Sequence, residues 1–209
     1  MSIVIAELKE SVFDFVHDSQ KTFKSLLMAS AFPGKIHQIN IIHLAFPDES
    51  YHAILQPFLT LLDLETGFCV YSHDIRRKEK VSSYITINTN CPYVPISEAD
   101  FILCLEPTLG ESFKELKNGT LHRPDKSATV FYLAESVCNE SDNGSVQLVL
   151  TGPGVKNETR LSFNGIEIKE IEKWKTNRKN YPLGVDVFII TKSGDLVSIP
   201  RSVKISYEK

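Results

Sequence analysis

A helix is predicted over residues 18–31, where apolar side chains recur every three or four positions and the dipeptide Pro33-Gly34 follows. The side chains expected on its apolar face are Phe23, Leu26, Leu27 and Ala31. Asp18 or Ser19 can cap its first turn, because a short polar side chain there accepts from free backbone N–H groups. The pattern therefore indicates an amphipathic helix that packs on a core.

Most other hydrophobic positions form short runs rich in β-branched and aromatic residues, which are typical of strands. The predicted strands cover residues 35–44, 68–71, 97–106, 128–137, 146–155 and 160–168. The run over 128–137 has almost no polar alternation, which indicates a strand covered on both faces. Residues 185–200 are predicted to form a β-hairpin that turns at Gly194.

Helical patterns lie between these strands. We expect short helices over 57–67, with Pro57 in the first turn, over 111–119 and over 167–181. Residues 75–90 are ambiguous, since a charged helical segment leads into a β-branched one, and residues 138–145 indicate a loop. Alternating strands and helices followed by a hairpin predict an α/β fold, a mixed sheet with flanking helices, in a single domain over residues 1–209.

Composition and charge exclude several classes of protein. Hydrophobic residues make up 42% and charged residues 23%, as in ordinary globular chains, and the net charge of −3 is no footprint for nucleic acid or an anionic membrane. No apolar run approaches the roughly 18 residues of a membrane span, and we expect a cytoplasmic protein with reduced cysteines. Residues 1–155 carry a net charge of −7 and residues 156–209 one of +4. This difference could help subunits to orient on one another, but two normally solvated surfaces are the favoured interpretation.

No combination of side chains in the sequence is typical of a catalytic or metal site. The six histidines include no HExxH motif and no pair spaced i, i+4. No serine lies in a G-x-S-x-G elbow, and the paired carboxylates lie in polar stretches typical of solvated charge. We therefore expect no catalytic residue, no cofactor-binding residue and no metal ligand.

Two glycine turns and one arginine are the strongest candidates for binding. The turn Thr151–Gly154 follows an apolar strand, and its glycines could aim N–H groups at an oxyanion. Pro153 removes one of these donors, so the sequence favours a tight structural turn. Asp186 follows the turn at Gly184 and could tether backbone N–H groups or pair with a basic residue. Arg201, after the hairpin, could hold a carboxylate or phosphate.

Several motifs occur together in a recognisable order. They are Asp18-x-Gln20-x-x-Phe23-Lys24-x-Leu26-Leu27-x-Ala29 closed by Pro33-Gly34, Leu61-Leu62-Asp63 with Thr66, Thr89-Asn90-Cys91-Pro92, Thr151-Gly152-Pro153-Gly154, Tyr181-Pro182-Leu183-Gly184-Val185-Asp186 and Ile199-Pro200-Arg201. Over nearly the whole chain this order resembles the PhnH family, subunits of the carbon–phosphorus lyase core complex. The chain departs from the family pattern at Ala29-Ser30-Ala31-Phe32, where Ala-Met-Ser is usual before the Pro-Gly.

The resemblance implies a fold like the large domain of pyridoxal-phosphate-dependent transferases, shortened and without the cofactor-anchoring residues. We therefore expect no pyridoxal phosphate. The lysines agree with this expectation, because residues such as Lys78, Lys114 and Lys173 lie in charged, helical or turn stretches, and none follows an apolar strand in the manner of a Schiff-base lysine.

The resemblance also implies partners and a role. It predicts a homodimer that assembles with the G, I and J subunits and supports formation of ribose 1-phosphonate 5-triphosphate from ATP and an alkylphosphonate, with ATP or the phosphonate at a shared site. No activity is expected of the chain alone, and no nucleic acid or membrane is expected to bind. The candidate ligand or interface residues are Gln20, Pro33, Gly34, Thr151, Gly152, Gly154, Gly184, Asp186 and Arg201.

An alternative of a different class follows from the residues alone. The turn Thr151–Gly154 and Arg201 could serve a stand-alone small-molecule enzyme that acts on a phosphorylated or phosphonate ligand. The lack of a convergent nucleophile and base in the sequence favours the accessory subunit over this enzyme.

Overall fold

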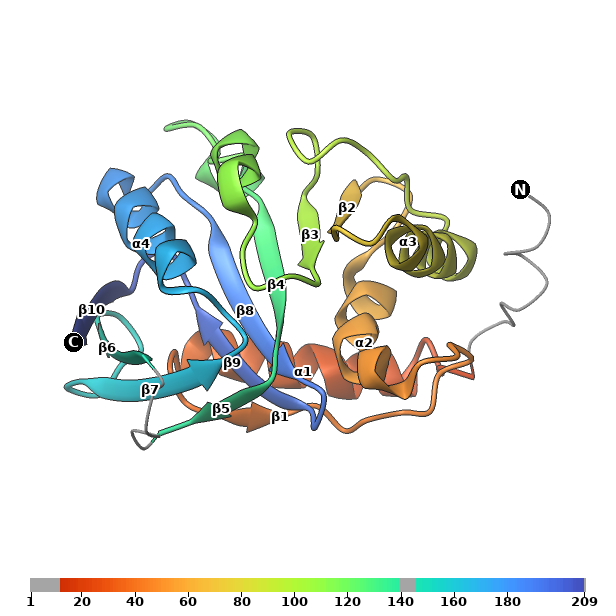
Figure 1. Ribbon diagram of the computed structural model, residues 1–209, viewed down its shortest axis with the longest axis horizontal. Helices are drawn as coiled ribbons and strands as arrows, with labels where there is room; N and C mark the ends of the chain where they lie inside the picture. The colour runs from red at the N-terminus through yellow and green to blue at the C-terminus, as the bar shows by residue number, and fades with distance from the viewer. Residues whose placement is uncertain (1–11, 140–145, 209) are drawn as a thin grey trace.

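A six-stranded mixed sheet forms the centre of the protein in a computed structural model that describes residues 12–139 and 146–208 (Figure 1). The strand order is β1-β9-β8-β4-β3-β2, in which β2, β3, β4 and β8 run parallel and β9 and β1 are antiparallel to their neighbours. The bounds are β1 (His37–Gln38), β2 (Phe68–Tyr71), β3 (Phe101–Cys104), β4 (Thr129–Ala134), β8 (Asp186–Thr191) and β9 (Asp195–Ile199). The mixed sheet and the hairpin at Gly194 were both predicted and are confirmed.

A second, four-stranded antiparallel sheet was not predicted. Its order is β10-β6-β7-β5, with bounds β5 (Ser136–Cys138), β6 (Val146–Thr151), β7 (Thr159–Asn164) and β10 (Lys204–Glu208). The apolar run over 128–137 is two strands rather than one, because at Glu135 the chain leaves the first sheet and its N–H donates to the Asn164 carbonyl of the second at 3.0 Å. Most of the loop predicted over 138–145 lies outside the described residues.

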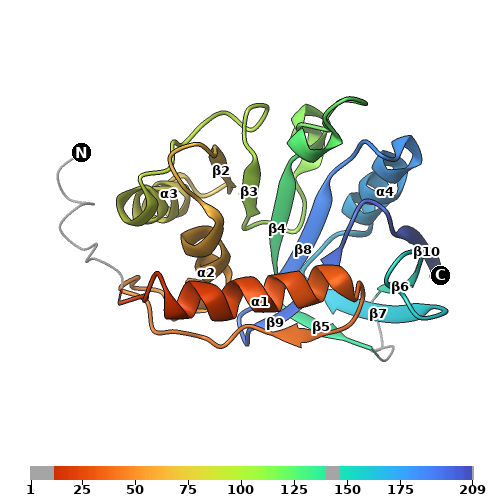
Figure 2. The ribbon, with the colours of Figure 1, turned by 180° about the vertical axis from the view of Figure 1, so that it is seen from behind.

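Helices cover one face of the large sheet, and the small sheet with one helix covers the other. The helices α1 (His17–Ala31), α2 (His52–Leu61) and α3 (Ile75–Thr89) lie on the first face, and α1 crosses it near the end of the molecule that holds β5 and β7 (Figure 2). On the second face lie α4 (Ile168–Asn177) and the small sheet. Short 3₁₀ turns complete the chain: η2 (Glu49–Tyr51), η3 (Gly110–Glu115), η4 (Pro124–Lys126) and η5 (Arg178–Asn180). Flanking helices were thus predicted correctly.

Alternation along the parallel strands divides the core in two. Val70, Leu103 and Phe131 point to the side of α1, α2 and α3. Cys104 and Tyr132, their neighbours in sequence, point to the side of α4 and the small sheet. Because both faces are covered, these strands read as continuous apolar runs. Within the two described ranges, no helix is long and apolar enough to cross a membrane.

The ambiguous segment over 75–90 is a helix throughout. Asp74 caps α3, since its Oδ1 accepts from the backbone N–H of Arg76 at 2.9 Å and of Arg77 at 3.2 Å. Asn90 ends it in the left-handed conformation. The β-branched second half stays helical because Tyr84 and Ile85 are buried in the core, and this packing outweighs local propensity.

The start of α1 differs from the prediction. The bounds that were expected, 18–31, are correct within one residue, but the N-cap residue is Val16, which makes no side-chain cap, and the turn before the helix is held by Asp14. Asp18 contributes to that turn, because its Oδ2 accepts from the Asp14 N–H at 3.1 Å. Oδ1 of Asp14 accepts from the backbone N–H of Val16 at 2.8 Å and of His17 at 3.0 Å. These bonds hold the pKa of Asp14 at about 2, below its usual value.

The apolar face predicted for α1 is wrong in part. Leu26 is buried together with Thr22 and Ala29, whereas Phe23 is 51% exposed and Leu27 56% exposed. The helix therefore has two apolar faces. The face that contains Thr22, Leu26 and Ala29 packs on α2 and β9. The face that contains Phe23 and Leu27 is exposed to solvent.

Two further predictions needed correction. The helix predicted over 57–67 is α2, which begins at His52 and ends at Leu61. Pro57 lies inside this helix and not in its first turn, since the helix directly continues the 3₁₀ turn η2. The turn that follows is closed by Asp63, whose Oδ1 accepts from the N–H of Thr66 at 3.0 Å. Of the strand predicted over 35–44, only His37–Gln38 forms one, β1, and residues 39–44 belong to no helix or strand.

Candidate functional site

Four of the sequence motifs surround one pocket. This motif pocket, of about 400 Å³, is lined by Pro33 after α1, Gly154 after β6, Asp186 and Phe188 on β8, and Ser198 on β9, among others. It lies where β8 and β4 begin. The sequence left open whether the two glycine turns are neighbours, and the structure brings Gly154 and Asp186 to the same cavity.

The turns at Gly34 and Gly154 pack closely against other segments of the chain. Gly34 has φ +79°, and a Cβ there would lie 2.9 Å from Leu150 Cδ1. Gly154 also has φ +79°, and its Cβ would lie 2.7 Å from the Ala31 carbonyl oxygen. Such distances exclude a side chain, so both glycines are needed for α1 to meet the turn after β6.

The turn Thr151–Gly154 has the geometry of a tight structural turn. The N–H of Val155 donates to the Gly152 carbonyl at 3.1 Å, and Thr151 pairs with Lys204 across the small sheet. Gly152 packs against the backbone of Ser202, where a Cβ on the glycine would lie only 3.2 Å from the Ser202 carbonyl oxygen. This arrangement favours the structural reading of the turn over an oxyanion cradle.

Arg201 is held by groups of its own chain. Its guanidinium forms an ion pair with Asp186 at 3.0 Å. Nη1 donates to the carbonyl oxygens of Pro124 at 2.6 Å and Gly184 at 3.1 Å, and to the hydroxyl of Ser127. Asp186 in addition accepts from the Arg201 backbone N–H at 2.8 Å. The sequence offered two roles for Asp186, binding a backbone N–H and pairing with a basic side chain. Asp186 has both roles, and Arg201 is the partner in each.

Gly184 and Gln20 lie apart from the motif pocket. Gly184 is buried, donates its N–H to the Asn118 carbonyl at 3.0 Å, and has no room for a Cβ, which would lie 2.6 Å from Asn177 Oδ1. Gln20 is exposed on α1. It lies one turn after Val16 and one turn before Phe23, in the middle of the helix's solvent-exposed apolar side.

That side of α1 is an exposed hydrophobic surface. Val16 is 72%, Phe23 51% and Leu27 56% exposed, and their spacing of seven and four residues puts them in one line along the helix. We call them the α1 apolar stripe. Met28 and Phe32, which are 38% and 46% exposed, extend the hydrophobic area beside it. Contiguous apolar surface of this kind is typical of a protein interface.

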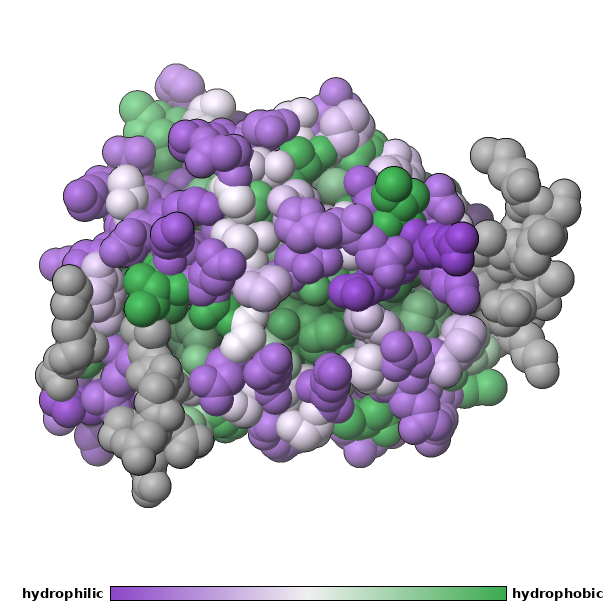
Figure 3. Space-filling model, viewed as in Figure 1, coloured by the Kyte–Doolittle hydropathy of each residue, from purple (hydrophilic) through white to green (hydrophobic). Residues whose placement is uncertain are grey.

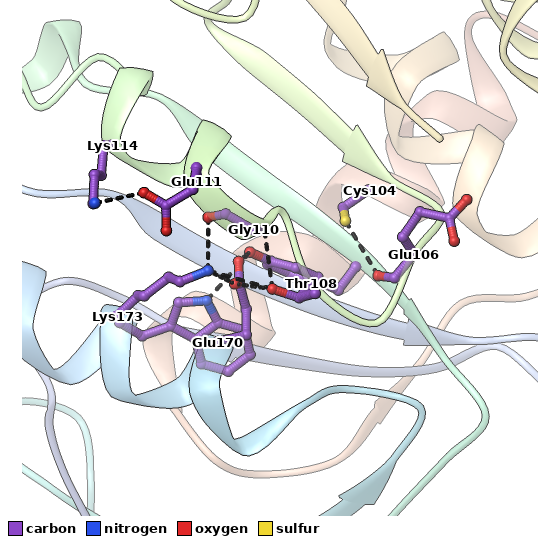
Figure 4. A network of polar contacts seen from close by, with 10 residues as sticks. Cys104, Glu106, Thr108, Gly110, Glu111, Lys114, Glu170 and Lys173 are labelled. Carbon is purple, nitrogen blue, oxygen red and sulfur yellow. Dashed lines mark hydrogen bonds and ion pairs between the residues drawn. The ribbon is translucent and has the colours of Figure 1, made fainter. Parts of the chain in front are cut away.

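A buried polar network joins α4 to the large sheet (Figure 4). The carboxylate of Glu170 is fully buried and accepts from the hydroxyl of Tyr132, from Thr108 Oγ1 at 2.6 Å and from Lys173 Nζ at 2.9 Å. Lys173 Nζ also donates to the Gly110 carbonyl at 2.7 Å. The network connects α4, β4 and the loop before η3 through one charge that is fully satisfied.

Burial controls the ionisation of the groups around this network. It raises the pKa of Tyr132 and of the Cys104 thiol, and the neighbouring carboxylate of Glu170 acts in the same direction on both. The Cys104 thiol donates to the Glu106 carbonyl at 3.2 Å. Both groups are therefore neutral at physiological pH, and the thiol is a poor nucleophile.

Sequence reasoning missed this network and one lysine. The signal for Glu170 was its place four residues before Trp174 and eight before Arg178, on the buried face of α4, where a carboxylate is unusual. The lysine is Lys192, which lies in the turn of the hairpin and directly follows the apolar strand β8. It lines a second pocket of about 320 Å³ with Tyr51, Arg77 and Glu106, which we call the strand-end pocket.

Metal chemistry was not predicted for this chain. Within residues 12–139 and 146–208, no group of three or more His, Cys, Asp or Glu side chains is placed to share a metal ion. The four cysteines are free thiols, three of them buried.

Comparison with known proteins gives the relationship of the chain. Residues 11–206 match the sequence profile of the PhnH family, described as bacterial phosphonate metabolism protein. A relative from Rhizobium meliloti (strain 1021), named alpha-D-ribose 1-methylphosphonate 5-triphosphate synthase subunit PhnH, is 26% identical over 93% of this chain and 94% of its own length. HtxG of Stutzerimonas stutzeri, provisionally named a C-P lyase subunit, is 26% identical over 90% of this chain and 85% of its own length. The match over nearly the whole chain means that this protein belongs to the PhnH family.

Proposed function

We propose that this chain is an accessory subunit of a carbon–phosphorus lyase complex and supports formation of ribose 1-phosphonate 5-triphosphate from ATP and an alkylphosphonate. The observation that carries the proposal is the family match over residues 11–206, together with relatives of similar length that are named as subunits of such an enzyme. The chain acts by holding other subunits in place.

The arrangement of the motif residues supports an accessory role. Arg201, the residue best suited to bind a phosphate, has its guanidinium occupied by Asp186, Ser127 and two carbonyl oxygens. Gly34 and Gly154 serve the contact between α1 and the turn after β6. The features that mark the family are thus used inside this chain to fix its shape, as a scaffold requires.

The α1 apolar stripe supports a subunit that binds other protein surfaces. We propose that it is the contact of a homodimer, because its charges are self-complementary. Asp14 and Asp18 lie at the start of α1 with Lys21, which pairs with Asp18 at 3.3 Å, and Lys24 and Lys35 lie in the middle of the helix and beyond its end. Two antiparallel copies of α1 would place each acidic end against a basic one, with Phe23 and Leu27 between them.

The remaining partners follow from the same proposal. The G, I and J subunits of the complex bind the surface that the homodimer leaves free, and ATP or the phosphonate is shared with them.

The protein is cytoplasmic, consists of one domain over residues 1–209, and resembles a shortened large domain of a pyridoxal-phosphate-dependent transferase that binds no pyridoxal phosphate. The parallel strands β2, β3, β4 and β8, covered on both faces, are compatible with that resemblance.

Adenine release tests the proposal. The purified chain is incubated with ATP and methylphosphonate, alone and with the G and I subunits, and free adenine is measured by chromatography. Adenine is expected only when the other subunits are present, with a faster release when this chain is added to them. Release by this chain alone, lost in Arg201→Ala, would instead support the stand-alone enzyme.

Co-purification provides the second test. The tagged chain is recovered from cells grown without phosphate but with a phosphonate as phosphorus source, and its companions are identified by mass spectrometry. The G, I and J subunits are expected in stoichiometric amounts. Recovery of the chain without any of them would contradict the proposed role.

A further inference from the structure

We propose that the strand-end pocket binds a small zwitterion that carries an ammonium group and a tetrahedral oxyanion of the phosphonate or phosphate class. The pocket lies at the opposite end of the large sheet from the motif pocket. Ala134 and Lys192, at the ends of β4 and β8, line the strand-end pocket, whereas Thr129 and Asp186, at their beginnings, line the motif pocket. The two cavities are therefore distinct sites.

The topology of the sheet creates the cavity. The chain leaves β2 toward α3 on one face of the sheet, and it leaves β3 toward η3 on the other, as the packing of Tyr84 and Phe113 in the two separate cores shows. Adjacent loops that diverge to opposite faces open a crevice beyond the carboxyl ends of parallel strands, which is where α/β sheets bind ligands. Figure 3 shows that hydrophobic residues are exposed near the middle of the side seen in Figure 1, among hydrophilic ones.

Cationic and hydroxyl donors line one part of the pocket. Lys192 is exposed, and its ammonium makes no hydrogen bond or ion pair with the described residues. The guanidinium of Arg77 lies 3.7 Å from Glu106 and 4.0 Å from Asp74, which leaves N–H donors for an anion. Burial raises the pKa of Tyr51, so its phenol remains a neutral donor.

Two carboxylates face the same pocket, and they differ in their partners. Oε1 of Glu106 accepts from Ser72 Oγ at 2.8 Å and from the His73 N–H at 2.9 Å, so its position is fixed by the chain. The carboxylate of Glu135 is exposed and has no side-chain partner among the described residues. It is the group that can accept from a ligand's ammonium.

The balance of charge selects the kind of ligand. Arg77 and Lys192 would attract a simple anion, but Glu106 and Glu135 in the same pocket would repel it. A compact ligand with both charges satisfies the cations and the carboxylates together. A volume of about 320 Å³ has room for a molecule of this size.

This inference deepens the proposed function by naming a ligand class, and it is tested on the isolated chain. Failure of binding would leave the adenine-release and co-purification results unaffected, and failure of those would leave a binding result standing. The two proposals can therefore be distinguished.

Isothermal titration calorimetry of the full chain provides the test. The probes are 2-aminoethylphosphonate, its phosphate counterpart O-phosphoethanolamine, ethylphosphonate without the ammonium, and ethylamine without the oxyanion. Both zwitterions are expected to bind, ethylphosphonate about tenfold more weakly, and ethylamine without measurable heat. Binding of ethylphosphonate as tight as that of the zwitterions, or of neither zwitterion at millimolar concentration, would overturn the proposal.

Variants assign the two parts of the pocket. Lys192→Gln and Arg77→Gln are each expected to weaken binding of 2-aminoethylphosphonate about tenfold. Glu135→Gln should remove the preference for 2-aminoethylphosphonate over ethylphosphonate. Arg76→Gln, a matched loss of charge one residue from Arg77 and outside this pocket, should bind as the unaltered chain does.

The thermal melting curve of each variant shows whether it is folded. Because Lys192, Arg77 and Glu135 are exposed or half-exposed, these variants are expected to melt within about 2 °C of the unaltered chain. Folded variants at Lys192 and Glu135 with unchanged affinities would exclude the strand-end pocket as the site.

Discussion

The hydroxyl of Tyr132 donates to the carboxylate of Glu170 at a point that solvent does not reach. The same hydroxyl oxygen accepts from the indole N–H of Trp174 at 3.3 Å. One atom thus connects β4 to two successive turns of α4. This connection fixes the helix on the large sheet more specifically than the surrounding apolar contacts can, because each of these polar groups is costly to leave unpaired.

Tyr132→Phe is expected to lower the free energy of unfolding by about 1–3 kcal/mol, since Glu170 and Trp174 each lose a buried partner. Urea unfolding followed by circular dichroism measures the change. Tyr207→Phe is the matched control, because the Tyr207 hydroxyl also donates to a glutamate of α4, Glu172, at 3.1 Å, but on the exposed side. It should cost less than about 0.5 kcal/mol, and equal losses in the two variants would contradict the role of the buried network.

Stability is expected to fall as the pH rises above about 9. The pKa of the Cys104 thiol is raised above its usual value of 9.0 in the folded protein, chiefly by burial. Above that usual value the unfolded chain has lost the proton that the folded chain still holds, so each further pH unit favours unfolding by up to about 1.4 kcal/mol for this group. Below pH 9 the thiol has no effect.

Urea titrations between pH 7 and pH 10.5 measure this slope. In Cys104→Ala the decline above pH 9 should be shallower by up to about 1.4 kcal/mol per pH unit, whatever the variant's stability at pH 7. The decline that remains is expected from the thiols of Cys69 and Cys91 and, above about pH 10, from Tyr132, because burial raises the pKa of each of these groups as well. If the unfolding free energy of the variant fell with pH as steeply as that of the unaltered chain, Cys104 would have the same pKa in the folded and the unfolded protein.

Gly154→Ala is expected to destabilise the protein by about 2–3 kcal/mol. The new Cβ would meet the Ala31 carbonyl oxygen at 2.7 Å, in addition to the strain of a side chain at φ +79°. Gly110→Ala separates the two effects, because Gly110 has φ +57° but a Cβ there would lie 3.8 Å from its nearest neighbour, Tyr71 Oη. This control should lose about 1 kcal/mol in a urea titration, and a loss as large as that of Gly154→Ala would count against close contact as the cause.

Replacing Phe23 and Leu27 together by serine is expected to convert the proposed homodimer into a monomer. Both side chains are more than half exposed, so the unfolding free energy of the subunit should change by less than about 1 kcal/mol. Sedimentation equilibrium gives the mass. Leu64→Ser with Leu121→Ser is the matched control, since these leucines are 73% and 74% exposed elsewhere, and the proposed interface would be wrong if both pairs behaved alike.

The purified protein is expected to carry no pyridoxal phosphate. Its absorbance spectrum should lack a visible band, and borohydride should leave it unchanged. Lys192 makes the measurement informative, because it follows an apolar strand and lines a pocket at the strand ends. A stoichiometric yellow chromophore bleached by borohydride, and missing in Lys192→Gln, would contradict the expectation.

Much of the fold was predictable because hydrophobic pattern and turn residues act locally. Strands β2, β3 and β8 are short apolar runs bounded by glycine, proline or charge, and α1 ends where Pro33 forbids its continuation. The second sheet was not predictable in this way. The two sheets separate where the backbone N–H of Glu135 donates to the Asn164 carbonyl. These positions are distant in sequence, so no local pattern encodes the contact.

The candidate site was predictable in its members but not in their roles. Proline and glycine mark where the chain bends, so Pro33, Gly154 and Asp186 could be singled out from the sequence, and they do line one pocket. That Arg201 is occupied by its own chain depends on the carbonyl oxygens of Pro124 and Gly184, which only the folded backbone brings together. Glu170 was overlooked because a carboxylate in a first helical turn is usually solvated.

The passage of the chain through Glu135 has a mechanical consequence. Glu135 is the single residue between the end of β4 and the start of β5, and its side chain lines the strand-end pocket beside Gly165, which follows β7. The outer layer and the pocket wall therefore cannot move independently. A partner protein that binds β5 or β7 and shifts either strand is therefore expected to move residues that line this pocket. Binding of the partner would then change the affinity of the pocket for its proposed ligand.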